Sequence, residues 1–85
     1  MNSKGIQAED IQALIAANLQ CEHVAVEGDG DHSFAVIASS TFEGQNRVQR
    51  QRAINAIVND KIASGELHAL SMKTLTPAEW AQQQA

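Results

Sequence analysis

The chain has 85 residues, and its 6 basic and 10 acidic side chains give a formal net charge of −4. We expect one domain over residues 1–85 with loosely held ends, about 1–6 and 82–85, and a thin core, because a chain of this size buries only about 60–65% of its unfolded surface. The negative charge disfavours broad adhesion to nucleic acid or to an anionic membrane. The single cysteine, Cys21, excludes an internal disulfide and an all-cysteine metal site. No segment approaches the ~20 apolar residues of a membrane span, so we expect a soluble, cytoplasmic protein.

The first half of the chain predicts a helix followed by a β-hairpin. Apolar residues recur at helical spacing over about residues 8–19. From His23 the apolar period changes to two, which is typical of a strand. The turn signal Gly28-Asp29-Gly30-Asp31 then precedes a second apolar run, Phe34–Ala38. Two strands around such a turn form a hairpin.

The second half predicts a helix, a strand and a capped final helix. Helical spacing returns from Val48 to about Ala63, and Leu67 to Thr74 alternates as a third strand. In Thr76-Pro77-Ala78-Glu79 the threonine and glutamate form a capping box around proline at the first helical position. The order α-β-β-α-β-α is an α+β fold, with a three-stranded sheet whose helices pack on one face.

The three histidines are the first candidates for chemistry. His68 begins the third predicted strand, His32 follows the hairpin turn, and His23 enters the first strand. None has the spacing of a self-sufficient metal site, so a structural role is the simpler interpretation of each. Two histidines on adjacent strand ends can nevertheless meet at one edge and complete a metal site whose other ligands come from a partner.

A basic run at the start of the second predicted helix contains Arg47, Arg50 and Arg52. It is either a solvated helix face or a patch that contacts phosphate or an acidic partner. The Gly-x-x-Gly of an RNA-binding KH domain is missing, since Gly44 stands alone. There is no catalytic serine pattern, no glycine-rich phosphate loop and no nucleophile signature around Cys21, so we do not expect an enzyme.

Several segments together resemble the BolA family, in particular its short bacterial branch, over about Ile11 to Trp80. They are Gly28-Asp29-Gly30-Asp31-His32, Phe42-Glu43-Gly44, Arg47 to Arg52, Leu67-His68-Ala69-Leu70 and Leu75-Thr76-Pro77-Ala78-Glu79-Trp80. The resemblance implies a class II KH-like fold with a three-stranded mixed sheet. It also implies a non-catalytic adaptor in iron–sulfur and iron homeostasis, which partners a monothiol glutaredoxin through a shared [2Fe-2S] cluster.

In the arrangement that this resemblance implies, the glutaredoxin cysteine and glutathione hold much of the cluster. His68 matches the histidine ligand of the family, and His32 is the candidate for a second ligand from the hairpin. Some family members are DNA-binding transcriptional regulators, and Arg47, Arg50 and Arg52 would serve that alternative. We expect the free protein to be a monomer or a weak homodimer, without a membrane partner.

Overall fold

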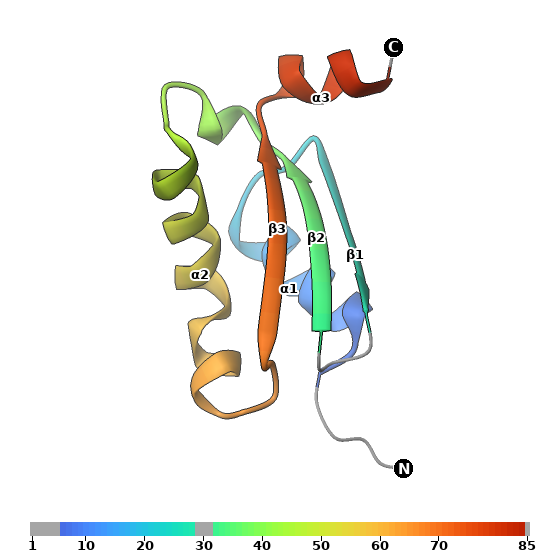
Figure 1. Ribbon diagram of the computed structural model, residues 1–85, viewed down its shortest axis with the longest axis vertical. Coiled ribbons are helices and arrows are strands. Elements are labelled where there is room, and N and C mark those ends of the chain that lie inside the picture. Colours follow the sequence, from blue (N-terminus) through green and yellow to red (C-terminus); the bar gives the residue numbers. More distant parts are fainter. Residues whose placement is uncertain (1–5, 29–31, 85) are drawn as a thin grey trace.

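The computed structural model describes residues 6–28 and 32–84 of the chain (Figure 1). Its elements in chain order are α1 (Ala8–Asn18), β1 (His23–Gly28), β2 (His32–Ala38), a 3-10 turn (Ser40–Phe42), α2 (Arg47–Ala63), β3 (Ala69–Leu75) and α3 (Pro77–Gln84). The predicted order α-β-β-α-β-α is confirmed. Residues 29–31 of the predicted turn and residues 1–5 and 85 of the predicted loose ends lie outside the described residues.

The three strands form one mixed sheet in the order β1-β2-β3. β1 pairs antiparallel with β2, which confirms the hairpin, and β2 pairs parallel with β3. In one row across the sheet, Val24 of β1 faces Ile37 of β2, which faces Thr74 of β3. β2 is therefore the central strand, and β3 lies at one edge of the sheet.

Helices α1 and α2 cover one face of this sheet and enclose the core between them and β2. In Figure 1, α1 lies behind the strands and α2 runs alongside β3. The side chains at the centre of this layer have no exposed surface: Ile11, Ile15, Ala35, Ile37, Phe42, Ile54 and Val58. Burying one large apolar side chain contributes about 1.5–3 kcal/mol, so a core of this size must be closely packed to hold the fold.

The third strand begins two residues later than the predicted range of Leu67 to Thr74. Leu67 is buried, but its backbone N–H donates to the carbonyl oxygen of Lys61 at 3.0 Å, near the end of α2. Gly65, with φ of +84°, supplies the left-handed residue that commonly follows a helix. Leu67 therefore belongs to the segment that closes α2, and His68 lies just before the strand.

The capping box predicted for α3 is confirmed. The backbone N–H of Thr76 donates to Glu79 Oε1 at 2.9 Å, and the N–H of Glu79 donates to Thr76 Oγ1 at 3.2 Å. The indole ring of Trp80 stacks on the imidazole of His23, with ring centroids 4.6 Å apart and planes 16° apart. Because Val24 packs against the core, its neighbour His23 faces the opposite side of the sheet.

The expectation that helices pack on one face therefore holds for α1 and α2. α3 lies across one end of the sheet, at the top of Figure 1, and its tryptophan contacts the other face. Among the described residues, no helix is both long enough and apolar enough to cross a membrane.

Candidate functional site

The two histidines predicted as metal ligands lie at the same end of the sheet. His32 is the first residue of β2 and pairs in register with Ala69, the first residue of β3. His68 directly precedes Ala69 in the chain. Because β2 and β3 run parallel, strand spacing places the Cα atoms of His32 and His68 about 6 Å apart. The structure thus brings the backbones of two residues close together that are 36 positions apart in the sequence.

Both histidines lie at the surface of the protein. Within residues 6–28 and 32–84, no group of three or more histidine, cysteine, aspartate or glutamate side chains is arranged to hold a metal ion. Two imidazoles provide only part of the coordination of an iron atom. An iron site built at this end of the sheet would therefore take its remaining ligands from a partner.

The third histidine, His23, serves a different purpose. It begins β1, where it pairs with Ala38 of β2, and this row lies at the opposite end of the sheet from His32. Its ring stacks on Trp80 and so ties α3 to β1. His23 is therefore a structural residue and a suitable control for experiments on the other two histidines.

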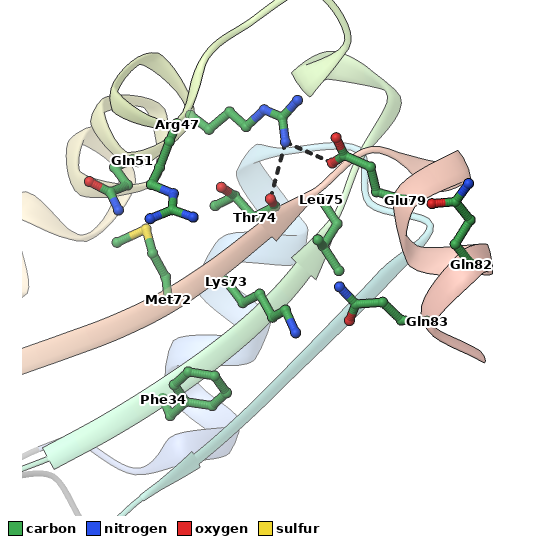
Figure 2. A pocket seen from close by; sticks show the side chains of 11 residues that line it. Phe34, Arg47, Gln51, Met72, Lys73, Thr74, Leu75, Glu79, Gln82 and Gln83 are labelled. Carbon is green, nitrogen blue, oxygen red and sulfur yellow. Dashed lines mark hydrogen bonds and ion pairs between the residues drawn. The ribbon is translucent and has the colours of Figure 1, made fainter. Parts of the chain in front are cut away.

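Of the three arginines predicted to contact phosphate, Arg50 is turned into the molecule. Its Nε donates to the Gln45 carbonyl at 2.9 Å, and its Nη1 donates to the Thr74 carbonyl at 3.1 Å and to Glu79 Oε1 at 2.9 Å. Figure 2 shows the last two contacts as dashed lines. The Arg50 side chain is only 13% exposed. These three contacts, called the arginine bridge below, join the start of α2 to the end of β3 and to α3.

The arginine bridge also affects the titration of Glu79. The pKa of the Glu79 carboxyl lies below its usual range. The hydrogen bond from the Thr76 backbone N–H is the largest cause, and the hydrogen bond from the Arg50 guanidinium is the next. Glu79 thus acts in two ways, because it caps α3 through Thr76 and neutralises Arg50. Sequence reasoning assigned it only the first role.

Arg47 and Arg52 remain exposed on α2. Positive charge in the first turns of a helix is unfavourable because the helix dipole is positive there. A second capping box offsets this cost, since Asn46 Oδ1 accepts from the Gln49 N–H and Gln49 Oε1 accepts from the Asn46 N–H, both at 2.9 Å. Sequence analysis missed this box, although Asn-x-x-Gln resembles the known motif. The predicted nucleic-acid contact thus remains a prediction, carried by Arg47 and Arg52.

Cys21 shows no sign of an activated thiol. Burial raises the pKa of the Cys21 thiol, and the negative charge of Glu22 adds to this effect. The thiol donates to the carbonyl oxygen of Leu19 at 3.2 Å. A thiol with a raised pKa is a poor nucleophile at neutral pH.

The mixed three-stranded sheet, its two covering helices and the two exposed histidines at one end of the sheet define a small α+β protein. The family model described as "BolA-like protein" matches residues 6–79. The chain belongs to the BolA family.

Relatives of this chain include bacterial and human proteins, which the match covers over most of their length. The chain is 34% identical over 77 residues to acid stress protein IbaG of Escherichia coli K12, covering 91% of this chain and 92% of that protein. It is 35% identical over 83 residues to human BolA-like protein 2, covering 92% and 94%. The solved structure of a bolA protein homologue from Coxiella burnetii matches with a TM-score of 0.78 at 36% identity, covering 89% of this chain and 97% of that one. Within its family, the chain is IbaG-like.

Proposed function

We propose that this protein is a non-catalytic adaptor that partners a monothiol glutaredoxin and helps to ligate or transfer a shared [2Fe-2S] cluster in iron–sulfur and iron homeostasis. The observation that carries the proposal is the placement of His32 at the start of β2 and of His68 just before β3, both exposed at the same end of the sheet. Membership of the BolA family supports it. A cytoplasmic location belongs to the same proposal.

The donor chemistry of these residues fits the cluster. Histidine nitrogen replaces cysteine sulfur on one iron of known [2Fe-2S] centres, so an imidazole is a competent ligand. In this proposal His68 is the first ligand from this chain and His32 the second, while the glutaredoxin cysteine and glutathione provide thiolates. The cluster supplies one-electron chemistry and transferable iron and sulfide when it is bound. The role of this chain is to present imidazoles from strand ends that the sheet holds in place.

The main test compares visible absorption and circular dichroism spectra of the complex reconstituted with glutaredoxin and glutathione. His68→Ala is expected to shift the cluster bands and to speed cluster loss, because one ligand to iron is removed. His32→Ala is expected to change the spectrum less, or only the rate of loss. The control is His23→Phe, which removes a histidine at the other end of the sheet while preserving an aromatic ring to stack on Trp80.

The spectra of His68→Ala and wild type must differ for the proposal to stand. Identical spectra and identical rates of cluster loss would remove His68 from the ligand set. Amide chemical shifts of labelled protein, titrated with apo and cluster-loaded glutaredoxin, provide a second measurement. Shifts around Ala69 at the start of β3 are expected with the loaded partner, and their confinement to the Trp80 end of the sheet would contradict the proposed site.

A second candidate function, DNA binding in transcriptional regulation, is favoured by Arg47 and Arg52. Both remain exposed on α2, and Arg47 lies in its first turn, where the helix dipole disfavours positive charge. If they contact phosphates, Arg47→Gln and Arg52→Gln should each lower the slope of log affinity against log salt by about one. Lys61→Gln, near the far end of α2, is the control. No binding to any duplex at low salt would exclude this function.

A further inference from the structure

The outer edge of β3 carries backbone hydrogen-bonding groups that no other strand of the sheet uses. β3 is the last strand in the order β1-β2-β3, so only its inner edge is paired. Leu75 directs its carbonyl to the inner edge, where the oxygen accepts from the Ser39 N–H at 2.9 Å, just after β2. Alternate residues of a strand direct their N–H and C=O groups to the same edge. Leu70, Met72 and Thr74 therefore direct theirs to the outer edge.

Arg50 bonds to this outer edge at one point only. Its Nη1 donates to the Thr74 carbonyl oxygen at 3.1 Å, near the end of the strand. Within residues 6–28 and 32–84, no residue forms a hydrogen bond to the Thr74 N–H or to the N–H and C=O of Met72. A row of unpaired backbone groups at a sheet edge is a template for pairing with another chain. The second half of β3 therefore has the backbone geometry to accept a further strand.

A hollow of about 580 Å³ lies along this part of β3. It is lined by the consecutive residues Met72 to Leu75, which span about 10 Å, and by residues of α2 and α3. Figure 2 shows Arg47 and Gln51 on one side of β3 and Lys73 on the other. This hollow and the outer edge of β3 are called the edge groove below. The side chains of a strand added here would alternate between the two sides.

The edge groove has an excess of positive charge, although the whole chain has a net charge of −4. Two of its charged residues, Arg50 and Glu79, neutralise each other at 2.9 Å. The other two, Arg47 and Lys73, are exposed and form no ion pair with a described residue. They lie on opposite sides of the strand, so they can pair with acidic side chains on either face of an added strand. The charges therefore favour an acidic occupant.

We propose that the edge groove binds an extended acidic segment of a partner protein, which adds a strand to the sheet beside β3. In this mode of recognition, main-chain hydrogen bonds to Met72 and Thr74 give affinity, and acidic side chains opposite Lys73 and Arg47 give specificity. A second copy of β3 is a poor occupant, because it would bring like charges together. Nucleic acid is opposed by the net charge of the chain. The inference is independent of the proposed function, since the edge groove lies at the opposite end of β3 from His68.

The probe for the test is a hexapeptide of alternating glutamate and threonine with blocked ends, titrated into isotope-labelled protein up to about 2 mM. The amide signals of Leu70, Met72 and Thr74 are expected to shift, and exchange of the Met72 N–H with solvent is expected to slow. The Lys73 N–H faces β2, so its exchange should stay unchanged and serves as the internal control. Two comparison peptides should bind at least about threefold more weakly. One has lysine in place of glutamate, and the other has every backbone nitrogen methylated and so cannot donate to β3.

Charge-reversed variants test which side chains recognise the peptide. Lys73→Glu and Arg47→Glu are each expected to weaken binding of the glutamate peptide at least about threefold, and the double variant is expected to prefer the lysine peptide. Arg52→Glu is the matched control, because Arg52 is an exposed residue of α2 outside the edge groove. It should bind the glutamate peptide like wild type. Circular dichroism of each variant establishes that it is folded.

Four results would overturn the proposal. The first is the absence of shifts along β3 at about 2 mM glutamate peptide. The second is equal binding of the methylated peptide, which would mean attraction by charge without strand addition. The third is unchanged binding by both Lys73→Glu and Arg47→Glu. The fourth is a single-stranded oligonucleotide that shifts the same amides at lower concentration than the glutamate peptide, because the edge groove would then be a nucleic-acid site.

Discussion

In the sequence Arg50 is one of three arginines in a basic run, yet its guanidinium ends inside the molecule. Its donors satisfy the carbonyl groups of Gln45 and Thr74, which lie at the ends of two different segments, and its charge is paired with Glu79. It also lies 5.9 Å from the centroid of the Phe42 ring. A guanidinium suits this position because it offers several donors in a fixed plane. The charge of Arg50 therefore serves the fold.

The charge of Glu79 gives a pH-dependent stability. A carboxylate whose pKa is lower in the folded state than in the unfolded chain contributes stability that is full above the unfolded value and is lost as the pH falls through the folded one. Glu79→Gln retains a capping side chain but removes the charge that pairs with Arg50. We therefore expect Glu79→Gln to be less stable than wild type at pH 7, with the difference shrinking as the pH falls below about 4.5. Urea denaturation at several pH values measures it.

Glu43→Gln is the control for this pH series, because Glu43 is exposed and forms no ion pair with a described residue. It should track wild type throughout. If the deficit of Glu79→Gln is as large at low pH as at pH 7, the ion pair with Arg50 does not stabilise the fold.

Cys21 provides a second prediction at the residue scale. Because burial and Glu22 raise the pKa of its thiol, little thiolate is present at neutral pH. Alkylation by iodoacetamide at pH 7.5 should therefore be several-fold slower in the folded protein than in the protein unfolded by urea. Mass spectrometry over time measures both rates. Equal rates would show that the folded state does not protect the thiol.

At the scale of elements, α2 and α3 begin in the same way. Each starts with a reciprocal capping box, Asn46 with Gln49 and Thr76 with Glu79. The start of α2 is the less favourable of the two, because Arg47 adds a positive charge to the first turn of that helix, where the helix dipole is also positive. α2 therefore depends on its cap and on the burial of its apolar side.

Asn46→Ala should lower the free energy of unfolding by about 1 kcal/mol, because the N–H of Gln49 loses its acceptor. Chemical denaturation of the variant and of wild type gives the difference. The matched control is Asn59→Ala, an exposed asparagine within α2, which should be neutral or slightly stabilising because alanine is the better helix former. Equal losses in the two variants would show that the cap contributes nothing.

At the scale of the whole molecule, two phenylalanines of one small chain have opposite environments. Phe42 has no exposed surface, although it lies in a short 3-10 turn between β2 and α2. Phe34 lies in the central strand, yet it is 42% exposed, on the face of the sheet opposite α1 and α2. Burial therefore follows from the layering of the domain: Phe42 joins the layer between sheet and helices, and Phe34 lies on the uncovered side.

Phe42→Ala should lower the free energy of unfolding by about 3–5 kcal/mol, because it leaves a cavity in a thin core. This loss is a large part of the roughly 5–15 kcal/mol that stabilises a typical domain. Phe34→Ala should cost less than about 1 kcal/mol, because this side chain is far from fully buried. Thermal or chemical unfolding of the pair distinguishes them. A larger loss at Phe34 would mean that the face assigned as open is covered.

The sequence by itself determined the features that depend on residues close together in the chain. Helical spacing predicted α1 and α2, alternation around a glycine-rich turn predicted the hairpin, and Thr76 with Glu79 predicted the start of α3. These features depend on hydrogen bonds and side-chain directions within about four residues, which local sequence controls. The resemblance to the BolA family correctly implied the mixed sheet and pointed to His32 and His68.

Only the tertiary structure decided which of these residues meet. It placed His32 beside His68, stacked Trp80 on His23, turned Arg50 rather than Arg47 inward, and left Phe34 uncovered. Arg50 and Glu79 lie 29 positions apart, so no local pattern links them. Contacts of this kind depend on strand register and on how helices pack over the sheet, and many distant residues determine these together.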